Sequence, residues 1–206
     1  MQKKPYAIDI DDVLGSLSAL LNPALNKRFN RNIPLSAWST FNVTSLYDIT
    51  LEEFFEVIEG EQLISKIKPY PGVQAALKRL RAAAHPIVLI TSRGYHSDGY
   101  QLTERWLNQN NFFYDHLIVV PEGLSKAQAA IGYYPGGFEA MVDDYPPNLD
   151  KMKEAGLVTR TALIDQPWNQ DRADFVLHKN RFKSLVDFLL KELVPAEDSE
   201  LAAVLG

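Results

Sequence analysis

The stretch from Tyr6 to Gly15 constrains the fold of this chain more than any other. It joins an apolar run of strand-forming residues to three carboxylates, Asp9, Asp11 and Asp12, within four positions. Such a run is typical of a buried strand. Charged residues are rarely buried without partners, so the carboxylates are expected just past the carboxyl end of this strand. In open α/β sheets that end is where ligands bind.

The spacing of these carboxylates predicts a metal site. Asp9 and Asp11 are two residues apart, so an extended backbone directs both side chains to the same side. Carboxylates at close range repel, and a hard cation such as Mg²⁺, which prefers oxygen ligands, removes that conflict. A solvated strand-to-loop transition is the alternative, and it would be the better interpretation of an isolated pattern of this kind. An EF-hand is excluded, because Val13, Leu14 and Leu20 occupy positions that its calcium loop reserves for ligands and the turn glycine.

The composition is that of an ordinary soluble globular protein, with 46% hydrophobic and 23% charged residues. A length of 206 residues suits one domain with an insertion or a small second lobe. The net charge of −5, without a basic block, argues against a groove for a nucleic-acid polymer. The absence of cysteine excludes disulfides, zinc–thiolate sites and thiol catalysis. No segment resembles a signal peptide or a membrane span, so a cytoplasmic location without a membrane partner is expected.

Apolar runs alternate with helical patterns along the rest of the chain. Further strands are predicted at 87–90, 117–120, 138–142 and 161–164, with a short sixth strand at 175–177. Helices are predicted between and after them, at 73–84, 100–108, 125–131, 149–155 and 182–193. This alternation predicts an α/β fold with a doubly wound, mostly parallel, Rossmann-like sheet.

The segment 16–69 is mostly helical and is too long for a simple crossover helix. Within it Thr50 can cap a helix, and Glu53 stands at the capping-box position. We expect this segment to be a small helical cap, inserted after the first strand and lying over its carboxyl end. Residues 1–15 and 70–194 would then form the catalytic core, and 195–206 a C-terminal tail. The alternative is a group of ordinary core helices.

Polar side chains recur where the predicted strands end. The second strand ends at Thr91 and Ser92, Lys126 follows the third, and the fourth ends at Asp143 and Asp144. A parallel sheet would bring these groups to the same edge as the first carboxylates. Taken singly each is ordinary, because a Thr after a strand is usually a turn residue and a Lys is usually solvated. Four consecutive strand ends of this kind indicate one site.

The combined set is what phosphoryl transfer requires. A carboxylate can attack phosphorus and form an aspartyl-phosphate, and a second one can protonate the leaving alkoxide and later activate water. Mg²⁺ held by carboxylates neutralises developing charge. The Thr91 hydroxyl and nearby backbone N–H groups can hold phosphate oxygens, and Lys126 supplies a positive charge.

With these motifs the chain resembles the haloacid dehalogenase (HAD) superfamily of phosphohydrolases. The segment 7–13, Ala-Ile-Asp-Ile-Asp-Asp-Val, is similar to its first motif. The resemblance implies that Asp9 is the nucleophile and a metal ligand. It implies that Asp11 is the general acid/base, with its backbone carbonyl on the metal. Because the dehalogenases lack that acid, the presence of Asp11 favours phosphate chemistry.

The remaining motifs of the superfamily are matched further along the chain. The resemblance implies that Thr91, Ser92 and Lys126 bind phosphate. It implies that Asp143 is a ligand of Mg²⁺, the expected cofactor, and that Asp144 has a supporting role near Lys126.

A narrower resemblance, to 5'(3')-deoxyribonucleotidase-like enzymes, covers nearly the whole chain. Its most specific segment is Asp165–Asn169, with the sequence Asp-Gln-Pro-Trp-Asn, and the segment 143–148 is similar as well. Asp12 departs from the pattern, because many relatives have Gly there. This resemblance implies a (deoxy)nucleoside monophosphate as the substrate.

Three functions follow as hypotheses. The first is an Mg²⁺-dependent phosphatase of nucleoside monophosphates, in which Trp38, Phe41 or Tyr47 of the cap faces the base, since aromatic faces suit nucleobases. The second is a phosphatase of sugar phosphates or other small metabolites. The third is a catalytically silent binding domain, against which the intact set of site residues argues. A homodimer is compatible with the sequence, which does not determine the oligomeric state.

Overall fold

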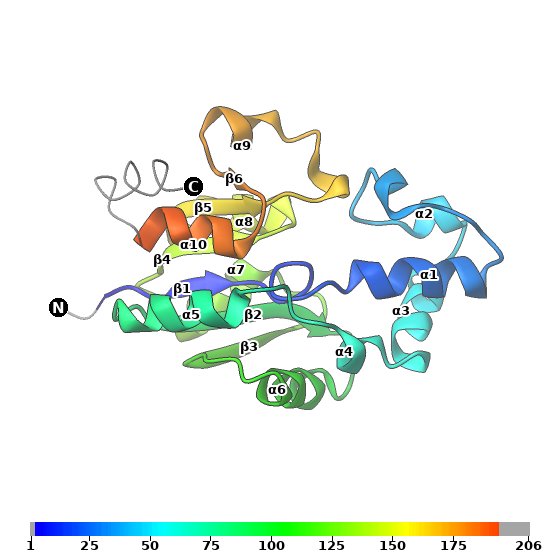
Figure 1. Cartoon of the computed structure of the whole chain (residues 1–206), viewed down its shortest axis with the longest axis horizontal. Helices are drawn as coiled ribbons and strands as arrows, with labels where there is room; N and C mark the ends of the chain where they lie inside the picture. The colour runs from blue at the N-terminus through cyan, green and yellow to red at the C-terminus, as the bar shows by residue number, and fades with distance from the viewer. Residues whose placement is uncertain (1–2, 194–206) are drawn as a thin grey trace, which may run out of the picture.

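The structure, a computed structural model, describes residues 3–193. Its centre is a six-stranded sheet with the order β3-β2-β1-β4-β5-β6, in which every pair of neighbours is parallel (Figure 1). The strands are β1 (Tyr6–Ile8), β2 (Ile87–Gly94), β3 (His116–Pro121), β4 (Phe138–Asp143), β5 (Val158–Ile164) and β6 (Arg181–Phe182). The predicted α/β, Rossmann-like fold is therefore confirmed. The predicted tail, 195–206, lies outside the described residues.

Helices cover both faces of this sheet. They are α5 (Val73–Ala82), α6 (Gly99–Gln109), α7 (Lys126–Tyr133), α8 (Pro146–Glu154), α9 (Ala173–Leu177) and α10 (Leu185–Leu193). Successive residues of a strand point to opposite faces. Ile8 and Leu89 accordingly pack in the cluster with α5, α6 and α10, whereas Ala7 and Val88 pack in the cluster with α7 and α8. Burial on both faces is why the central strands are apolar throughout.

One predicted strand is wrong. The segment 175–177 forms helix α9, and the sixth strand is β6, four residues further on. Of the three apolar side chains, Phe175 is buried, whereas Val176 and Leu177 are 58% and 80% exposed. An apolar run this short does not distinguish a strand from a helix, and here a single side chain anchors the turn to the core.

The segment between β1 and α5 forms a separate helical lobe, which we call the cap. It contains α1 (Ser18–Arg28), the 3₁₀ turn η1 (Leu35–Ala37), α2 (Thr44–Tyr47), α3 (Leu51–Gly60) and α4 (Leu63–Lys66). The predicted capping box starts α3, with Glu53 N donating to Thr50 Oγ1 at 3.1 Å and Thr50 N donating to Glu53 Oε2 at 2.8 Å. An apolar cluster built mainly from cap residues, together with Trp168 of the core, holds the lobe together, and the cap lies beyond the carboxyl ends of the strands (Figure 1).

The two ends of the cap segment meet in a narrow neck. Gly15 pairs with Pro69 in an antiparallel bridge, and Tyr70 N donates to Leu14 O at 2.9 Å. A Cβ at Gly15 would lie 2.7 Å from Ile67 Cγ2 and 2.8 Å from the Lys68 carbonyl oxygen, so only glycine allows this approach. The neck therefore holds the cap close to the end of β1.

Asp12 ties the cap to the neck on the other side. It has a left-handed backbone, with φ of 58°, which explains why glycine suits this position. Its carboxylate accepts hydrogen bonds from Ser18 Oγ at 2.6 Å, from Ser18 N at 3.2 Å and from Ser16 Oγ at 3.2 Å. These bonds satisfy the first turn of α1. Throughout 3–193, no helix combines the length and the apolar character that a membrane crossing needs.

Candidate active site

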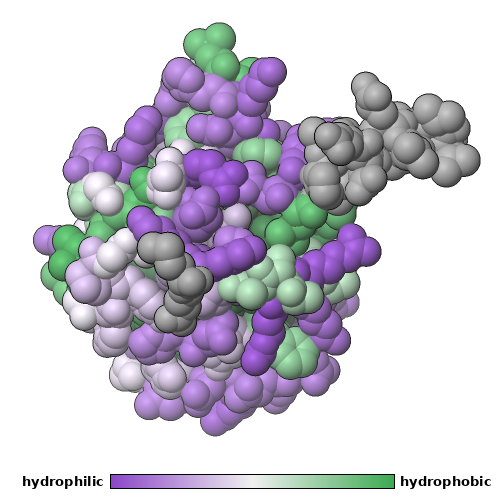
Figure 2. Space-filling view, turned by 90° about the vertical axis from the view of Figure 1, so that its left-hand side faces the viewer, coloured by the Kyte–Doolittle hydropathy of each residue, from purple (hydrophilic) through white to green (hydrophobic). Residues whose placement is uncertain are grey.

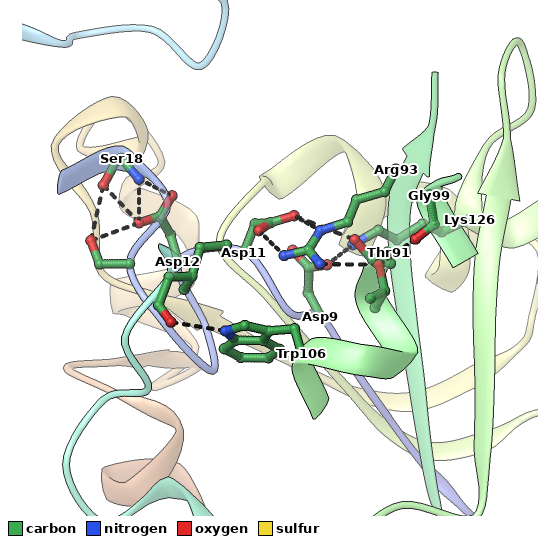
Figure 3. Close-up of polar contacts among 12 residues, drawn as sticks. Asp9, Asp11, Asp12, Ser18, Thr91, Arg93, Gly99, Trp106 and Lys126 are labelled. Carbon is green, nitrogen blue, oxygen red and sulfur yellow. Dashed lines mark hydrogen bonds and ion pairs between the residues drawn. The ribbon is translucent and has the colours of Figure 1, made fainter. Parts of the chain in front are cut away.

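The strands β1, β2 and β4 are neighbours in the sheet, and Asp9, Asp11, Thr91 and Lys126 come together at their carboxyl ends (Figure 3). Asp9 directly follows β1, and its N–H donates to Val142 O of β4 at 2.9 Å. Thr91 lies within β2 and is fully buried. The parallel topology thus assembles groups that are far apart in the sequence, as predicted.

Lys126 joins two of the carboxylates. Its Nζ lies 2.6 Å from Asp9 Oδ1 and 2.7 Å from Asp143 Oδ2, and the side chain is 2% exposed. The residue opens α7, whose N-terminus is closed by a capping box between Ser125 and Gln128. Burial opposes its charge, but the two carboxylates outweigh burial and raise the pKa of Lys126 above its ordinary value. The ammonium therefore stays protonated, as the predicted phosphate-binding role requires.

A cluster of carboxylates fits a hard cation. Asp9, Asp143 and Asp144 each offer an oxygen within 4.8 Å of the others, and all three are buried. Burial, together with the neighbouring carboxylates, raises the pKa of Asp9 to about 7 and that of Asp144 well above its ordinary value. One lysine does not balance three buried carboxylates, and a divalent cation with oxygen ligands would.

The two adjacent aspartates differ in their partners. Asp143 Oδ2 accepts from Lys126, Asp143 Oδ1 accepts from Tyr145 N at 2.9 Å, and Asn148 Nδ2 contacts both oxygens. Asp144 Oδ2 instead accepts from Trp168 Nε1 at 2.9 Å. Of these two aspartates, Asp143 is thus the ion-pair partner of Lys126, and Asp144 lies near enough to feel its charge.

Asp11 is held by an arginine that the sequence analysis did not identify as a site residue. Arg93 Nε and Nη2 donate to the two carboxylate oxygens at 2.9 and 2.6 Å, and Arg93 Nη1 donates to Thr103 Oγ1 at 3.0 Å (Figure 3). The Thr91 hydroxyl is 3.4 Å from Asp11 Oδ2. Arg93 is 1% exposed. An arginine so close to a strand end, two residues after the predicted phosphate-binding Thr91, was the available signal.

A cavity of about 380 Å³ lies between the cap and these groups. Its polar end, which we call the floor, comprises Asp9, Asp11, Thr91, Lys126 and Asp144. Its apolar side, which we call the roof, comprises the cap residues Leu21, Trp38, Phe41, Phe54 and Phe55. Exposed Ser92 also lines the cavity. The opposite end of the molecule, where the strands begin, presents a mainly hydrophilic surface (Figure 2).

Two of the three predicted cap aromatics line this cavity. Trp38 and Phe41 do, and the Phe41 ring stacks on Tyr145 with the ring centroids 4.1 Å apart. Tyr47 does not: it is 1% exposed in the cap core, where its hydroxyl accepts from Asn22. Tyr47 lies on the side of α2 that packs into the cap core. The sequence pattern does not distinguish a ring in that core from one that faces the cavity.

Five further aromatics line the cavity and were not predicted: Phe54, Phe55, Tyr95, Tyr145 and Trp168. Tyr95 stacks on Phe55 of the roof at 4.1 Å, and Tyr145 stacks on Phe41. Both tyrosines follow a strand-end motif directly, one after the Thr91–Arg93 run and the other after the paired aspartates. Their nearness to those motifs was the signal that could have identified them.

Two known proteins are similar to this chain in sequence. A Bacillus subtilis protein described as "Putative nucleotidase YqfW" is 28% identical over 165 residues, which are 79% of this chain and 81% of that protein. A Halalkalibacterium halodurans protein described as "Putative nucleotidase BH1399" is 30% identical over 121 residues, which are 58% of this chain and 60% of that protein. No protein-family model matches the chain.

Solved structures agree in fold at low sequence identity. A HAD family hydrolase of Deinococcus radiodurans, with bound phosphate and sodium, has a TM-score of 0.62 at 16% identity, over 93% of this chain and 95% of that one. The chain therefore has the fold of haloacid dehalogenase (HAD) family hydrolases. A structure described as a "putative phosphoglycolate phosphatase" from Lactobacillus delbrueckii has a TM-score of 0.67 at 13% identity, over 94% of this chain and 99% of that one.

Proposed function

We propose that this chain is a HAD phosphohydrolase, and that it is an Mg²⁺-dependent 5'-nucleotidase that acts on (deoxy)nucleoside monophosphates through an aspartyl-phosphate. The observation that carries the proposal is the cavity with two unlike ends. Its floor presents Asp9, Lys126 and buried carboxylates, while its roof and sides are aromatic. A phosphate suits the first and a planar base suits the second. Both curated relatives are described as nucleotidases, which supports this choice.

Asp9 is the proposed nucleophile. Its carboxylate forms a bond to phosphorus while the bond from phosphorus to the ester oxygen breaks, and the product is an aspartyl-phosphate. Lys126, 2.6 Å from Asp9 Oδ1, favours the ionised form of this carboxylate and can neutralise charge on the phosphoryl oxygens. The buried Thr91 and the exposed Ser92 both line the cavity and are the proposed phosphate contacts.

Asp11 is the proposed general acid and base. It gives a proton to the departing ester oxygen and afterwards takes a proton from the water that hydrolyses the aspartyl-phosphate. In the structure both of its oxygens accept hydrogen bonds from Arg93. Delivery of a proton from one of these oxygens therefore requires that at least one bond to Arg93 is released.

We assign the metal to Asp9, the backbone carbonyl of Asp11, and Asp144. Both oxygens of Asp143 are engaged by Lys126, Tyr145 N and Asn148. Within 3–193, no hydrogen bond reaches Asp144 Oδ1, which leaves that oxygen free for a cation. The resemblance in sequence implies the opposite, with Asp143 as the metal ligand and Asp144 in the supporting role. When bound, Mg²⁺ neutralises the charge of the carboxylates and the phosphate.

The phosphorylated substrate could instead be a sugar phosphate, and the cavity argues against it. The hydroxyl groups of a sugar need hydrogen-bond partners once they are taken out of water. Away from the floor, the polar side chains of the lining are few, with Ser18, Asn42 and Asn148 among them. The large aromatic and aliphatic remainder matches a base better than a polyol.

The test is a substrate panel scored by released phosphate. Purified protein with Mg²⁺ is given 5'- and 3'-nucleoside monophosphates, hexose phosphates, phosphoglycolate and an aryl phosphate. We expect the highest kcat/KM for a nucleoside monophosphate and no turnover after chelation of divalent cations. A preference for hexose phosphates or phosphoglycolate would favour the metabolite phosphatase, and Asp9→Asn protein supplies the blank for contaminating phosphatases.

A further inference from the structure

Trp168 contacts a carboxylate of the proposed metal site and also lies against two rings of the roof. It lies in the 3₁₀ turn η2 (Pro167–Asn169), which follows β5. Its Nε1 donates to Asp144 Oδ2 at 2.9 Å. Its ring lies 6.2 Å from the ring of Trp38 and 6.4 Å from that of Phe41, centroid to centroid. The side chain is 7% exposed and lines the cavity.

The turn that carries Trp168 is fixed by its neighbour. Asn169 Nδ2 donates to the backbone oxygens of Asp144 at 2.8 Å and of Ile164 at 2.9 Å. Arg181 of β6 donates to Asn169 Oδ1 at 2.8 Å and to its carbonyl oxygen at 2.6 Å. These bonds link η2 to the ends of β4 and β5, so the indole approaches Asp144 from a rigid support.

The indole N–H selects one oxygen of Asp144. Because Oδ2 accepts the bond from Trp168, the carboxylate is held in one orientation and Oδ1 stays available. One oxygen of Asp144 lies within 4.8 Å of an oxygen of Asp9 and of Asp143. Partners that orient a ligand in this way commonly change metal affinity by about 10–100-fold when they are removed. An indole is a donor only, so it cannot compete with Asp144 for the cation.

We propose that Trp168 is a positioning residue for the metal site, and that its N–H and its ring have separable roles. The N–H orients Asp144 for the divalent cation. The ring is a wall of the cavity and contacts the part of the substrate that carries the phosphate. The inference rests on the metal assignment made under the proposed function.

Two substitutions separate the roles. Trp168→Phe keeps a ring and removes the N–H, so the concentration of Mg²⁺ needed for half-maximal turnover should rise about 10–100-fold. At saturating Mg²⁺ its turnover should return to within a few-fold of the wild-type rate. Trp168→Ala removes the wall as well, so saturating Mg²⁺ should not restore its KM. If Trp168→Phe shows a lower kcat and an unchanged Mg²⁺ requirement, the positioning role is overturned.

The second measurement is direct binding of Mg²⁺ by calorimetry without substrate. Trp38→Phe is the matched control, because that indole also lines the cavity but its buried Nε1 has no hydrogen-bond partner among residues 3–193. We expect unchanged affinity for Trp38→Phe, about 10–100-fold weaker binding for Trp168→Phe, and loss of binding for Asp144→Asn. Wild-type affinity in Trp168→Phe overturns this inference alone. Wild-type affinity in Asp144→Asn overturns the metal assignment of the proposed function instead.

Discussion

The floor and the roof of the cavity are built by opposite means. The floor consists of charged and polar side chains that are buried, or half-buried in the case of Asp11, and each has a hydrogen-bond or ion-pair partner. The roof consists of rings and aliphatic groups that pack on one another. A buried charge is costly unless its partners stay in place, so the floor tolerates little change. Apolar contacts are non-directional, so the roof can accept another shape at small cost.

This difference assigns catalysis and selectivity to different parts of the chain. The floor comes from the sheet, whose strand ends are fixed by the parallel register. The roof comes from the cap, which joins the core through the neck at Gly15 and Pro69. Substitutions in the floor should therefore affect all substrates, whereas substitutions in the roof should change their ranking.

The largest effect is expected at the nucleophile. Asp9→Asn should abolish turnover of every substrate, because an amide does not attack phosphorus and lacks the charge that holds a cation. The fold should persist, since Lys126 keeps its partner Asp143. Released phosphate and circular dichroism measure the two outcomes, and Asp171→Asn, an exposed carboxylate, is the control. Near-native turnover in Asp9→Asn would contradict the covalent mechanism.

A smaller effect, which depends on the leaving group, is expected at the general acid. Asp11→Asn should slow the hydrolysis of an alkyl phosphate by about 10²–10⁴-fold, because a poor leaving group needs the proton. An aryl phosphate should lose less. The comparison is made with kcat/KM for both esters at saturating Mg²⁺. Equal losses would mean that Asp11 does not transfer the proton.

The roof should alter selectivity. Phe41→Ala removes a ring that is 51% exposed and stacked on Tyr145. If a base stacks there, the loss for a nucleoside monophosphate should be ~1–3 kcal/mol in transition-state stabilisation, and a small aryl phosphate should be spared. Phe113→Ala is the matched control, since Phe113 is 41% exposed and packs near Lys78 and Arg81, outside the cavity lining. An equal loss for both esters would remove the base-stacking role.

The smallest expected effect is on the pH dependence of thermal stability, and it comes from Asp12, which lies where the cap joins the core. Burial raises the pKa of Asp12 from 3.8 to about 7, although its bonds to Ser18 oppose the shift. A carboxyl group whose pKa is raised by folding stabilises the fold below its unfolded pKa, and this contribution is lost as the pH rises through the folded value. Asn stays neutral, so the melting temperature of the wild type relative to Asp12→Asn should fall between about pH 4 and pH 7.

This shift should be measured without divalent cations by thermal unfolding. A difference of about 1 kcal/mol corresponds to about 2–4 °C for a chain of this length. Asp171→Asn, an exposed carboxylate, should follow the wild-type curve at every pH. A gap between the wild type and Asp12→Asn that does not change with pH would show that Asp12 is ionised to the same extent in both states.

Local sequence patterns suffice to predict the parallel sheet, the groups at its strand ends and the capping box of α3. These patterns are apolar runs, the polar residues that end them, and side chains three positions apart. Parallel strands bring their carboxyl ends to one edge whatever the details of packing. For that reason the sequence alone places Asp9, Asp11, Thr91 and Lys126 at one site.

The partners of these groups depend on the tertiary structure. Asp143 and Asp144 are adjacent in sequence, and their different environments come from Lys126 on one side and Trp168 on the other. The Arg93–Asp11 pair, the inward position of Tyr47 and the helix at 175–177 likewise depend on contacts between distant segments. The burial, orientation and protonation of a side chain depend on its neighbours in the folded structure. These neighbours are distant in sequence, so a local sequence pattern does not predict them.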